Sequence, residues 1–444
     1  MDTDMRFHRD TRLRQFVRKC GLDDTYKRWR RKAIRGRGKL FKNVTVVPFE
    51  ALLSDGLQGH QFMGGPIWPD WNRQTMARFN QGRNPKDSLP NKQEALRHYS
   101  GNRYAWIGPI YRHFGHGIAE FCTRMAYTLE ALDKPTLVFA MDCKGSVAEL
   151  EATPTWFKQL LAWYGVDAEQ VVLVNEPTHF DYLHVFPQGE QLPDVGPRCD
   201  YLQLLGELTE RNLSALPDLG EFPRMSCQTI AGRASNITYV SRARMIMSFA
   251  GEAYLEEILS EAGVNVFRPE LHGLRKQLAV YATSPRLIFA EGSAIHGTQL
   301  LGRSLNEVTV LMRRPEERFG EAFLRPRARQ ITYISCLEGL ICGETSTGVA
   351  RLWTGMPIFN EAKLVDWISQ LGLDVQRSWN STRFCTQVRK DIQQWLGFQA
   401  TQHHTISSRQ TIYRTMSDLG FPSLVGEAKS TIEHVPPNGV HLTK

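Results

Sequence analysis

The segment over residues 111–132 carries the side chains best suited to acid–base chemistry. A loop with His113 and His116 follows an expected strand and opens an expected helix. His116 and Glu120 are four residues apart, so on a helix the carboxylate can hydrogen-bond to the imidazole, fix its tautomer and raise its basicity, as a general base requires. A His–Glu pair on a solvated helix face is the alternative interpretation. The glycines that flank His116 favour function, because they let another group approach the backbone closely.

The second half of the chain offers residues suited to binding a diphosphate. Gly292 and Ser293 lie in a turn between an expected strand and an expected helix, where free N–H groups and the helix dipole can hold a phosphate. Arg242 and Arg244 stand two apart at the end of another strand, on one face if the backbone stays extended, and arginine suits bidentate phosphate recognition. The alternatives are a simple helix cap for Ser293 and ion pairs of the arginines with the acids of residues 251–263. Together these residues predict a site for a diphosphate-bearing donor.

Several motifs that would indicate other functions are absent from the sequence. It has no GxxxxGK[ST] loop and no GxGxxG, which argues against an ordinary NTPase and an NAD enzyme. Its eight cysteines include no pair at the two-residue spacing of zinc or redox motifs, and they favour a reducing compartment. The one Asp-x-Asp, Asp2 to Asp4, lies at the extreme N-terminus. We therefore expect no cofactor and no metal, with arginines and a helix dipole stabilising the leaving diphosphate.

With these residues in view, the sequence resembles glycosyltransferase family 61, in particular its bacterial members linked to capsular polysaccharide synthesis. The similarity runs from about Tyr104 to Leu301 and rests on three segments. The first is GHGIAE at the head of an expected helix, and the second is SRAR followed by Glu252, although Gly251 stands where the family has an asparagine. The third and most specific is PELHGLRKQLAVYATSPRLIFAEGSAIHGTQLL over residues 269–301.

The resemblance implies a fold, a reaction and a set of site residues. The fold is α/β, with two Rossmann-like domains facing a cleft in the GT-B arrangement. The reaction is metal-independent transfer from a nucleotide sugar with inversion at the anomeric carbon. The acceptor side would hold His116 and Glu120. The donor side would be lined by Arg242, Arg244, Glu252, Gln277, Gly292, Ser293 and His296.

We expect a single displacement as the mechanism. His116, oriented by Glu120, deprotonates an acceptor hydroxyl that attacks the anomeric carbon, and His113 is the second choice for the base. The two arginines and the helix that begins near Ser293 meet the charge of the leaving nucleoside diphosphate. The expected partners are a nucleotide-sugar donor and a saccharide or glycolipid acceptor, in capsular or surface polysaccharide synthesis. Two other classes stay open: a non-catalytic nucleotide- or sugar-binding assembly protein of a polysaccharide machine, and nucleic-acid binding through the basic N-terminus.

The elements that must position these residues follow an α/β pattern, because short β-branched runs alternate with helical patterns beyond residue 44. Strands are expected at 103–111, 136–140, 171–174, 183–186, 237–241, 264–268, 286–290, 307–312 and 331–335. Helices are expected near 116–132, 155–163, 200–214, 252–262, 273–282, 294–302, 361–371 and 387–396. The predicted units are a basic segment at 1–43, an acceptor-side domain at 44–225, a nucleotide-sugar domain at 226–375 and a helical tail at 376–444, with the interdomain linker in 214–227.

The charge of the 444-residue chain is uneven. Lys and Arg number 54 against 46 Asp and Glu, but residues 1–43 alone hold fifteen basic and five acidic side chains. The rest is slightly acidic, so we do not expect nucleic acid as the partner. Because apolar residues such as Trp29 interleave with these cations, the segment could form an amphipathic helix on an anionic membrane; a solvated tail or a helix packed on the body is the alternative. The sequence shows no eighteen-residue apolar run and no secretion signal, so we expect a cytoplasmic protein, peripheral at the inner face of the membrane.

Overall fold

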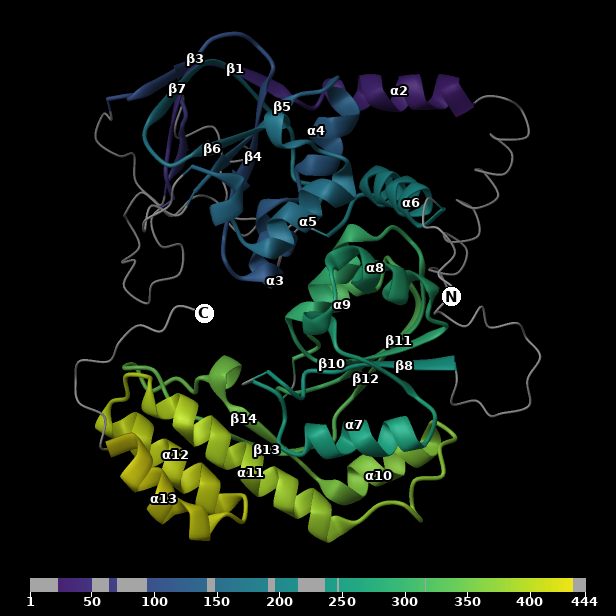
Figure 1. Cartoon of the computed structure of the whole chain (residues 1–444), viewed down its shortest axis with the longest axis vertical. Coiled ribbons are helices and arrows are strands. Elements are labelled where there is room, and N and C mark those ends of the chain that lie inside the picture. The colour runs from purple at the N-terminus through teal and green to yellow at the C-terminus, as the bar shows by residue number, and fades with distance from the viewer. Residues whose placement is uncertain are drawn as a thin grey trace.

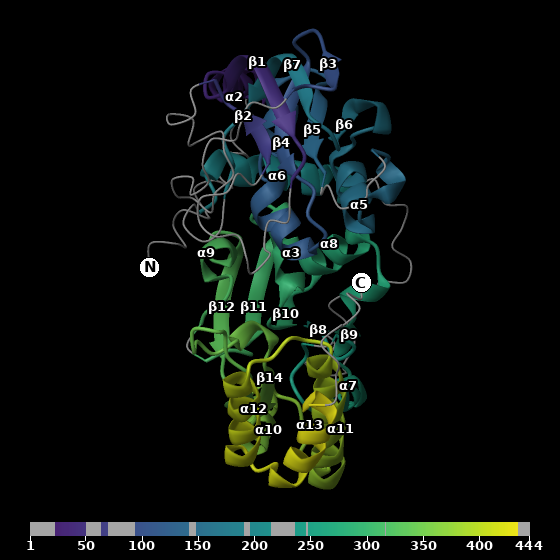
Figure 2. The same ribbon diagram turned by 90° about the vertical axis from the view of Figure 1, so that its left-hand side faces the viewer.

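The computed structural model of this chain describes residues 23–49, 64–69, 94–141, 148–190, 196–214, 236–245, 247–315 and 317–433. The α/β class predicted from the sequence is confirmed, with one large sheet in each half of the chain and helices around both (Figure 1). Figure 2 shows the elements in three tiers along the longest axis: the first sheet, the second sheet, and a group of helices from the C-terminal part.

The first sheet has seven strands in the order β2-β1-β7-β4-β5-β6, with β3 paired to β7. Strands β3 to β7 run parallel where they pair, whereas β1 is antiparallel to both β2 and β7. The expected strands of this half are present. The bounds are β1 Lys39–Val47, β2 Gly65–Ile67, β3 Arg97–Tyr99, β4 Tyr104–Pro109, β5 Thr136–Ala140, β6 Val171–Val174 and β7 Thr178–Val185. Strand β1 was not expected, and it crosses the predicted boundary between residues 43 and 44.

Helices of the first half cover this sheet. They are α2 Asp23–Arg35, α3 Phe114–His116, the π-helical turn η3 Gly117–Phe121, α4 Met125–Ala131, α5 Thr155–Tyr164 and α6 Cys199–Ser214, with short 3₁₀ turns η4 Leu150–Ala152 and η5 Ala168–Gln170. The single helix expected near 116–132 is therefore three pieces. Helix α5 ends at Gly165, whose φ of 70° gives the left-handed C-cap that glycine adopts without strain.

The second sheet is fully parallel, in the order β12-β11-β10-β8-β9. Its strands agree with those expected. They are β8 Ile237–Val240, β9 Asn265–Phe267, β10 Arg286–Ala290, β11 Leu305–Leu311 and β12 Ala328–Ile334. Between and after them lie α7 Glu252–Glu261, the 3₁₀ turn η7 Pro269–Leu271, α8 Leu274–Thr283, the 3₁₀ helix η8 Ser293–Leu300 and α9 Glu321–Leu324. Most of the expected linker, at 215–227, lies outside the described residues.

The C-terminal part packs on the second sheet's helices and does not stand apart as a tail. A two-stranded antiparallel sheet precedes four helices, two of which the sequence predicted in part. The elements are β13 Leu337–Ile341, the 3₁₀ turn η9 Leu352–Thr354, β14 Met356–Phe359, α10 Glu361–Gln370, α11 Ser381–Ala400, α12 Ile406–Asp418 and α13 Pro422–Glu433. Phe384 and Trp395 of α11 are buried in one hydrophobic cluster with Leu255 of α7. Asp391 of α11 also accepts a 2.8 Å hydrogen bond from the Gly251 backbone N–H.

The two halves share a buried interface. One hydrophobic cluster contains Phe157 and Leu160 of α5 together with Leu278 of α8. Arg327 and Glu190, from opposite halves, are both buried and form an ion pair whose Nη1–Oε2 distance is 3.0 Å. Arg327 further donates to the backbone carbonyls at the end of η8, so its charge is satisfied on both sides of the interface.

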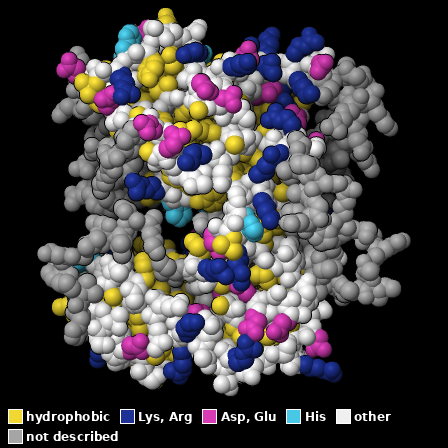
Figure 3. All heavy atoms as spheres, viewed as in Figure 1, with side chains coloured by type: hydrophobic (Ala, Val, Ile, Leu, Met, Phe, Trp, Pro, Cys, Tyr) yellow, Lys and Arg dark blue, Asp and Glu magenta, His cyan; other side chains and the backbone are white. Residues whose placement is uncertain are grey.

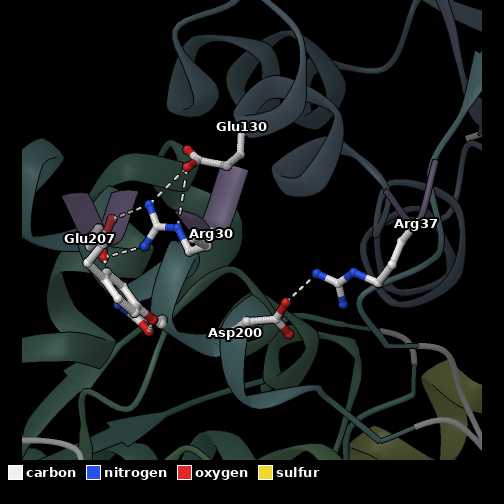
Figure 4. A network of polar contacts seen from close by, with 7 residues as sticks. Arg30, Arg37, Glu130, Asp200 and Glu207 are labelled. Atoms are coloured by element: carbon white, nitrogen blue, oxygen red, sulfur yellow. Dashed lines mark hydrogen bonds and ion pairs between the residues drawn. The ribbon is translucent and has the colours of Figure 1, made fainter. Parts of the chain in front are cut away.

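Helix α2 belongs to the body of the molecule. Its inward face buries Ile34 and Arg30, and Arg30 donates to Glu207 of α6 and Glu130 of α4 at 2.6 and 3.1 Å (Figure 4). Lys and Arg side chains gather over its outward face at the upper right of Figure 3. For residues 23–43 the structure thus supports the packed-helix alternative, while residues 1–22 lie outside the described part.

Candidate active site

Both predicted catalytic segments follow strands at points where the strand order reverses. In the first sheet the chain runs from β4 to β5 and β6 on one side and then to β7 on the other. In the second it runs from β8 to β9 and then back to β10. Ligands of open α/β sheets bind at the carboxyl ends of strands at such reversals. His113 follows β4, Arg242 follows β8 and Gly292 follows β10, so the fold places all three at this kind of position.

The two glycines beside His116 make room for neighbouring rings. A Cβ on Gly115 would lie 2.8 Å from Cδ2 of His296, which belongs to the second half of the chain. A Cβ on Gly117 would lie 2.2 Å from the indole of Trp156 in α5. The sequence argument for close approach at these glycines therefore agrees with the structure.

His116 and Glu120 form the expected pair. Nδ1 of His116 lies 2.5 Å from Oε1 of Glu120, and because an ionised carboxylate only accepts, the imidazole N–H is the donor. The opposite nitrogen, Nε2, is then the one that can accept a proton. The His116 side chain is 37% exposed and that of Glu120 only 6%. The backbone carbonyl of Glu120 accepts a 2.7 Å bond from Gln188, which helps to hold the π-helical turn.

An uninterrupted helix at 100° per residue would place Tyr127 on the same face as His116, but the structure does not. Tyr127 is fully buried, and its hydroxyl donates to Asp200 at 2.8 Å. The rotation of 100° per residue does not carry through, because the π-helical turn and a break at residues 122–124 separate the two positions. Buried Arg124 occupies that break and donates to the carbonyls of Phe186 and Ile107.

His296 and His113 meet His116 from different directions. The ring of His113 is centred 5.1 Å from that of His116. Burial, together with the nearby charges of His116 and Arg242, lowers the pKa of His113. Burial also lowers the pKa of His296 to about 4, and its Nδ1 lies 2.8 Å from Oε1 of Gln299. The imidazoles of His113 and His296 are therefore mainly neutral at pH 7.

Arg242 lies directly over Gly292. A Cβ on Gly292 would fall 1.7 Å from Nη1 of Arg242, so only glycine leaves space for the guanidinium there. Arg242 is buried, and its Nε has no hydrogen-bond partner among the residues that the structure describes. Burial lowers its pKa despite the nearby carboxylates of Glu252 and Glu291. Among the residues predicted to bind the sugar donor, Arg242 therefore offers a positive charge and an unpaired N–H group at the end of strand β8.

Arg244 does not share the environment of Arg242. The backbone N–H of Met245 donates to the Arg242 carbonyl at 2.7 Å, so the chain turns after β8. The prediction of one shared face required an extended backbone, and it is wrong because this turn directs Arg244 into solvent.

The side chains of Glu252 and Gln277 form hydrogen bonds within the protein and do not face an open site. Oε1 of Glu252 accepts from the Tyr239 hydroxyl at 2.9 Å and from the Arg242 N–H at 2.6 Å, and burial raises the pKa of Glu252 to about 7. Gln277 donates to two carbonyls of the 269–272 turn. Ser293 is the first residue of η8, and the N-cap position before it is Gly292, so Ser293 is not the simple helix cap of the alternative interpretation.

Sequence reasoning missed an arginine pair beside this site. Glu291 is fully buried, its Oε1 lies 2.6 Å from Nε of Arg314, and its Oε2 accepts from the Arg313 backbone N–H at 2.7 Å. Burial lowers the pKa of Arg313 to about 10. The signal was available, because Arg313 and Arg314 directly follow an expected strand that is adjacent to β10 in the sheet.

Comparison with known proteins adds no assignment. No family model matches the chain, and no curated protein matches it. The site therefore has to be interpreted from its own residues.

A cavity lies elsewhere in the first half of the chain. Its volume is about 790 Å³, and it is bounded by α2, α4 and α6, with Tyr26, Leu129 and Leu204 among its lining residues. The ion pairs of Arg30 occupy its wall (Figure 4). We instead place the proposed chemistry at the histidine–arginine junction, the region where His113 and His116 of the first half meet Arg242 and His296 of the second half. Titratable groups from both halves converge there.

Proposed function

We propose that the protein is an inverting, metal-independent glycosyltransferase that moves a sugar from a nucleotide-sugar donor to a saccharide acceptor. One observation carries the proposal: the segment with His116 contacts the segment with His296, beside Arg242 and Gly292. A general base and a group of arginines are thereby adjacent, each at a strand reversal of its own sheet. This supports the two-domain GT-B arrangement that the resemblance implies, in the synthesis of a capsule or another surface polysaccharide.

The proposed reaction is a single displacement. Nε2 of His116 takes the proton of an acceptor hydroxyl, while Glu120 holds Nδ1 and stabilises the imidazolium that forms. The acceptor oxygen bonds to the anomeric carbon, and the nucleoside diphosphate leaves with the electron pair of the broken bond. Arg242, with Arg314 nearby, compensates the negative charge on the leaving group. Attack on the face opposite the leaving group inverts the anomeric configuration.

The three histidines are not equivalent as bases. His296 is buried and has a pKa of about 4, so its imidazole is a weak base at neutral pH. The pKa of His113 is lowered, mainly by burial and also by the charges of His116 and Arg242. His116 alone combines a carboxylate partner with an accessible second nitrogen. We therefore assign the base to His116.

A screen of nucleotide sugars tests this function. Bound donor raises the apparent thermal stability by mass action, so we expect one nucleotide-sugar class to raise the Tm of the wild type and to do so much less for Arg242→Ala. Transfer or slow hydrolysis of that donor would then separate an enzyme from the alternative, a non-catalytic binding protein. If no nucleotide sugar raises the Tm and none is hydrolysed, the proposal is overturned.

We further propose that the protein works at the cytoplasmic face of a membrane, held there by α2. None of the helices in the described ranges is long and apolar enough to cross a bilayer. The outward face of α2 presents Arg28, Arg31 and Lys32, and Trp29 on its flank is 64% exposed. Cations with an exposed tryptophan fit an anionic lipid surface. A glycolipid acceptor would be reached from this position.

A further inference from the structure

Two strands of the first sheet bring together three metal-ligating side chains that no part of the proposed reaction uses. Strands β3 and β7 pair in parallel with His98 opposite His179. Asp181 lies two residues after His179, so both point to the same side of β7. Nε2 of His98 is 2.6 Å from Oδ1 of Asp181, and Nε2 of His179 is 3.9 Å from the same oxygen.

This geometry suits a divalent cation with tetrahedral coordination. One ligand atom from each of the three residues lies within 4.8 Å of the others. Ligands bonded to Zn²⁺ at about 2.0–2.1 Å are roughly 3.4 Å apart at the tetrahedral angle, and the two measured separations bracket that value. Two imidazoles and a carboxylate are the donor types that zinc prefers, with a fourth position left for water. His98 is 59% exposed, so water has access.

We propose that His98, His179 and Asp181 form a zinc site that fastens β3 to the sheet. Strand β3 has only three residues and pairs with β7 alone among the described strands. A three-residue strand gains few backbone hydrogen bonds, so a metal bridge across the pair would add to the attachment that Tyr99 provides by stacking on Phe180. Without metal, the same residues hold β3 through the His98–Asp181 ion pair, which is exposed and therefore weak.

The zinc site is separate from the proposed active site. His179 lies near the start of β7, whereas His113 and His116 follow the carboxyl end of β4, which is parallel to β7. The two sites therefore lie toward opposite ends of the first sheet. A structural ion here leaves the proposed transfer metal-independent, and either proposal can fail without the other.

The test is zinc binding by the tag-free, chelator-treated full-length protein. Competition with a chromophoric chelator should give one Zn²⁺ per chain, and zinc should raise the Tm while Mg²⁺ does not. His98→Ala and Asp181→Asn should each weaken zinc binding at least tenfold. The control is His184→Ala, on the same strand, whose imidazole lies 2.9 Å from the Asn102 carbonyl and should leave affinity unchanged.

Two outcomes would overturn the site. One is no zinc binding at 100-fold excess over protein, and the other is binding that persists unchanged in both His98→Ala and Asp181→Asn, which would place the ion elsewhere. Donor stabilisation and transfer, measured on the same zinc-free wild type, report separately on the proposed function.

Discussion

The contact between Gly292 and Arg242 allows a sharp test of the donor site by a change that adds a single methyl group. Gly292 has φ of 170°, an extended conformation that alanine adopts freely, so Gly292→Ala introduces no backbone strain. Its Cβ would nevertheless lie 1.7 Å from Nη1 and 2.4 Å from Cζ of Arg242. The guanidinium must therefore move by roughly 1.7 Å to reach an ordinary contact distance of 3.4 Å.

The displacement predicts the size of the effect. A hydrogen bond to a charged group contributes about 1.5–3 kcal/mol, and each 1.4 kcal/mol is about tenfold in affinity. Gly292→Ala should therefore weaken nucleoside diphosphate binding by about 10- to 100-fold, as should Arg242→Ala. If the glycine acts only by seating the guanidinium, the double variant binds no more weakly than Arg242→Ala, because the two changes remove one interaction. Calorimetry on the four proteins of this cycle measures the coupling.

A matched control is available at Gly397 in α11. A Cβ there meets nothing within 4 Å, so Gly397→Ala should leave nucleotide affinity unchanged and the fold at least as stable. Wild-type affinity of Gly292→Ala for the nucleoside diphosphate would refute the proposal that Gly292 leaves the space for the Arg242 guanidinium. Additive losses in the double variant would show that Gly292 acts by another route.

Three further predictions follow from the same structure. His116→Ala should lower turnover by about 100- to 10,000-fold while donor affinity is nearly retained; turnover within a few-fold of wild type would remove His116 as the base. Burial raises the pKa of Glu252 from 4.5 to about 7, so the folded state binds its proton more tightly than the unfolded state. Glu252 therefore contributes to the free energy of unfolding in full below about pH 4.5, and this contribution, on the order of 3 kcal/mol, is lost as pH rises to about 7. The free energy of unfolding of Glu252→Gln, measured in urea, should not show this decline. A pH profile identical to that of the wild type would contradict the assignment. Charge reversal at Arg28 and Lys32 together should reduce co-sedimentation with anionic vesicles about tenfold or more, whereas reversal at Lys390 in α11 should not; equal losses would argue against docking through α2.

The strands were predictable from sequence because their apolar runs are short and bounded by turns. The run RLIFA at residues 286–290, for example, is buried on both faces of a parallel sheet, and such strands appear as continuous hydrophobic segments. Strand β1 was missed for the opposite reason. Its residues, KLFKNVTVV at 39–47, begin among the cations of the N-terminal segment, and its buried positions do not alternate regularly with exposed ones.

Side-chain placement was less predictable wherever tertiary packing overrides local geometry. The helix after His116 is broken because Arg124 and Trp156 pack into it, and neither contact is encoded in helical spacing. Arg244 turned away because the chain bends after β8. Residues His98 and His179 are far apart in sequence, and only the parallel pairing of β3 with β7 joins them. The sole local signal was the His-x-Asp pattern of His179 and Asp181, which lies just before the strand expected at 183–186.

The buried ion pair between Arg327 and Glu190 has a consequence for how substrates enter. Separating the halves at this point would leave the buried Glu190 carboxylate without its Arg327 partner, at a cost of about 3–5 kcal/mol. We therefore expect any motion that opens the histidine–arginine junction to keep this ion pair together. Distances between spin labels on the two halves should change widely beside His116 and hardly at all beside Arg327. The proposed active site would then open along the edge away from this ion pair.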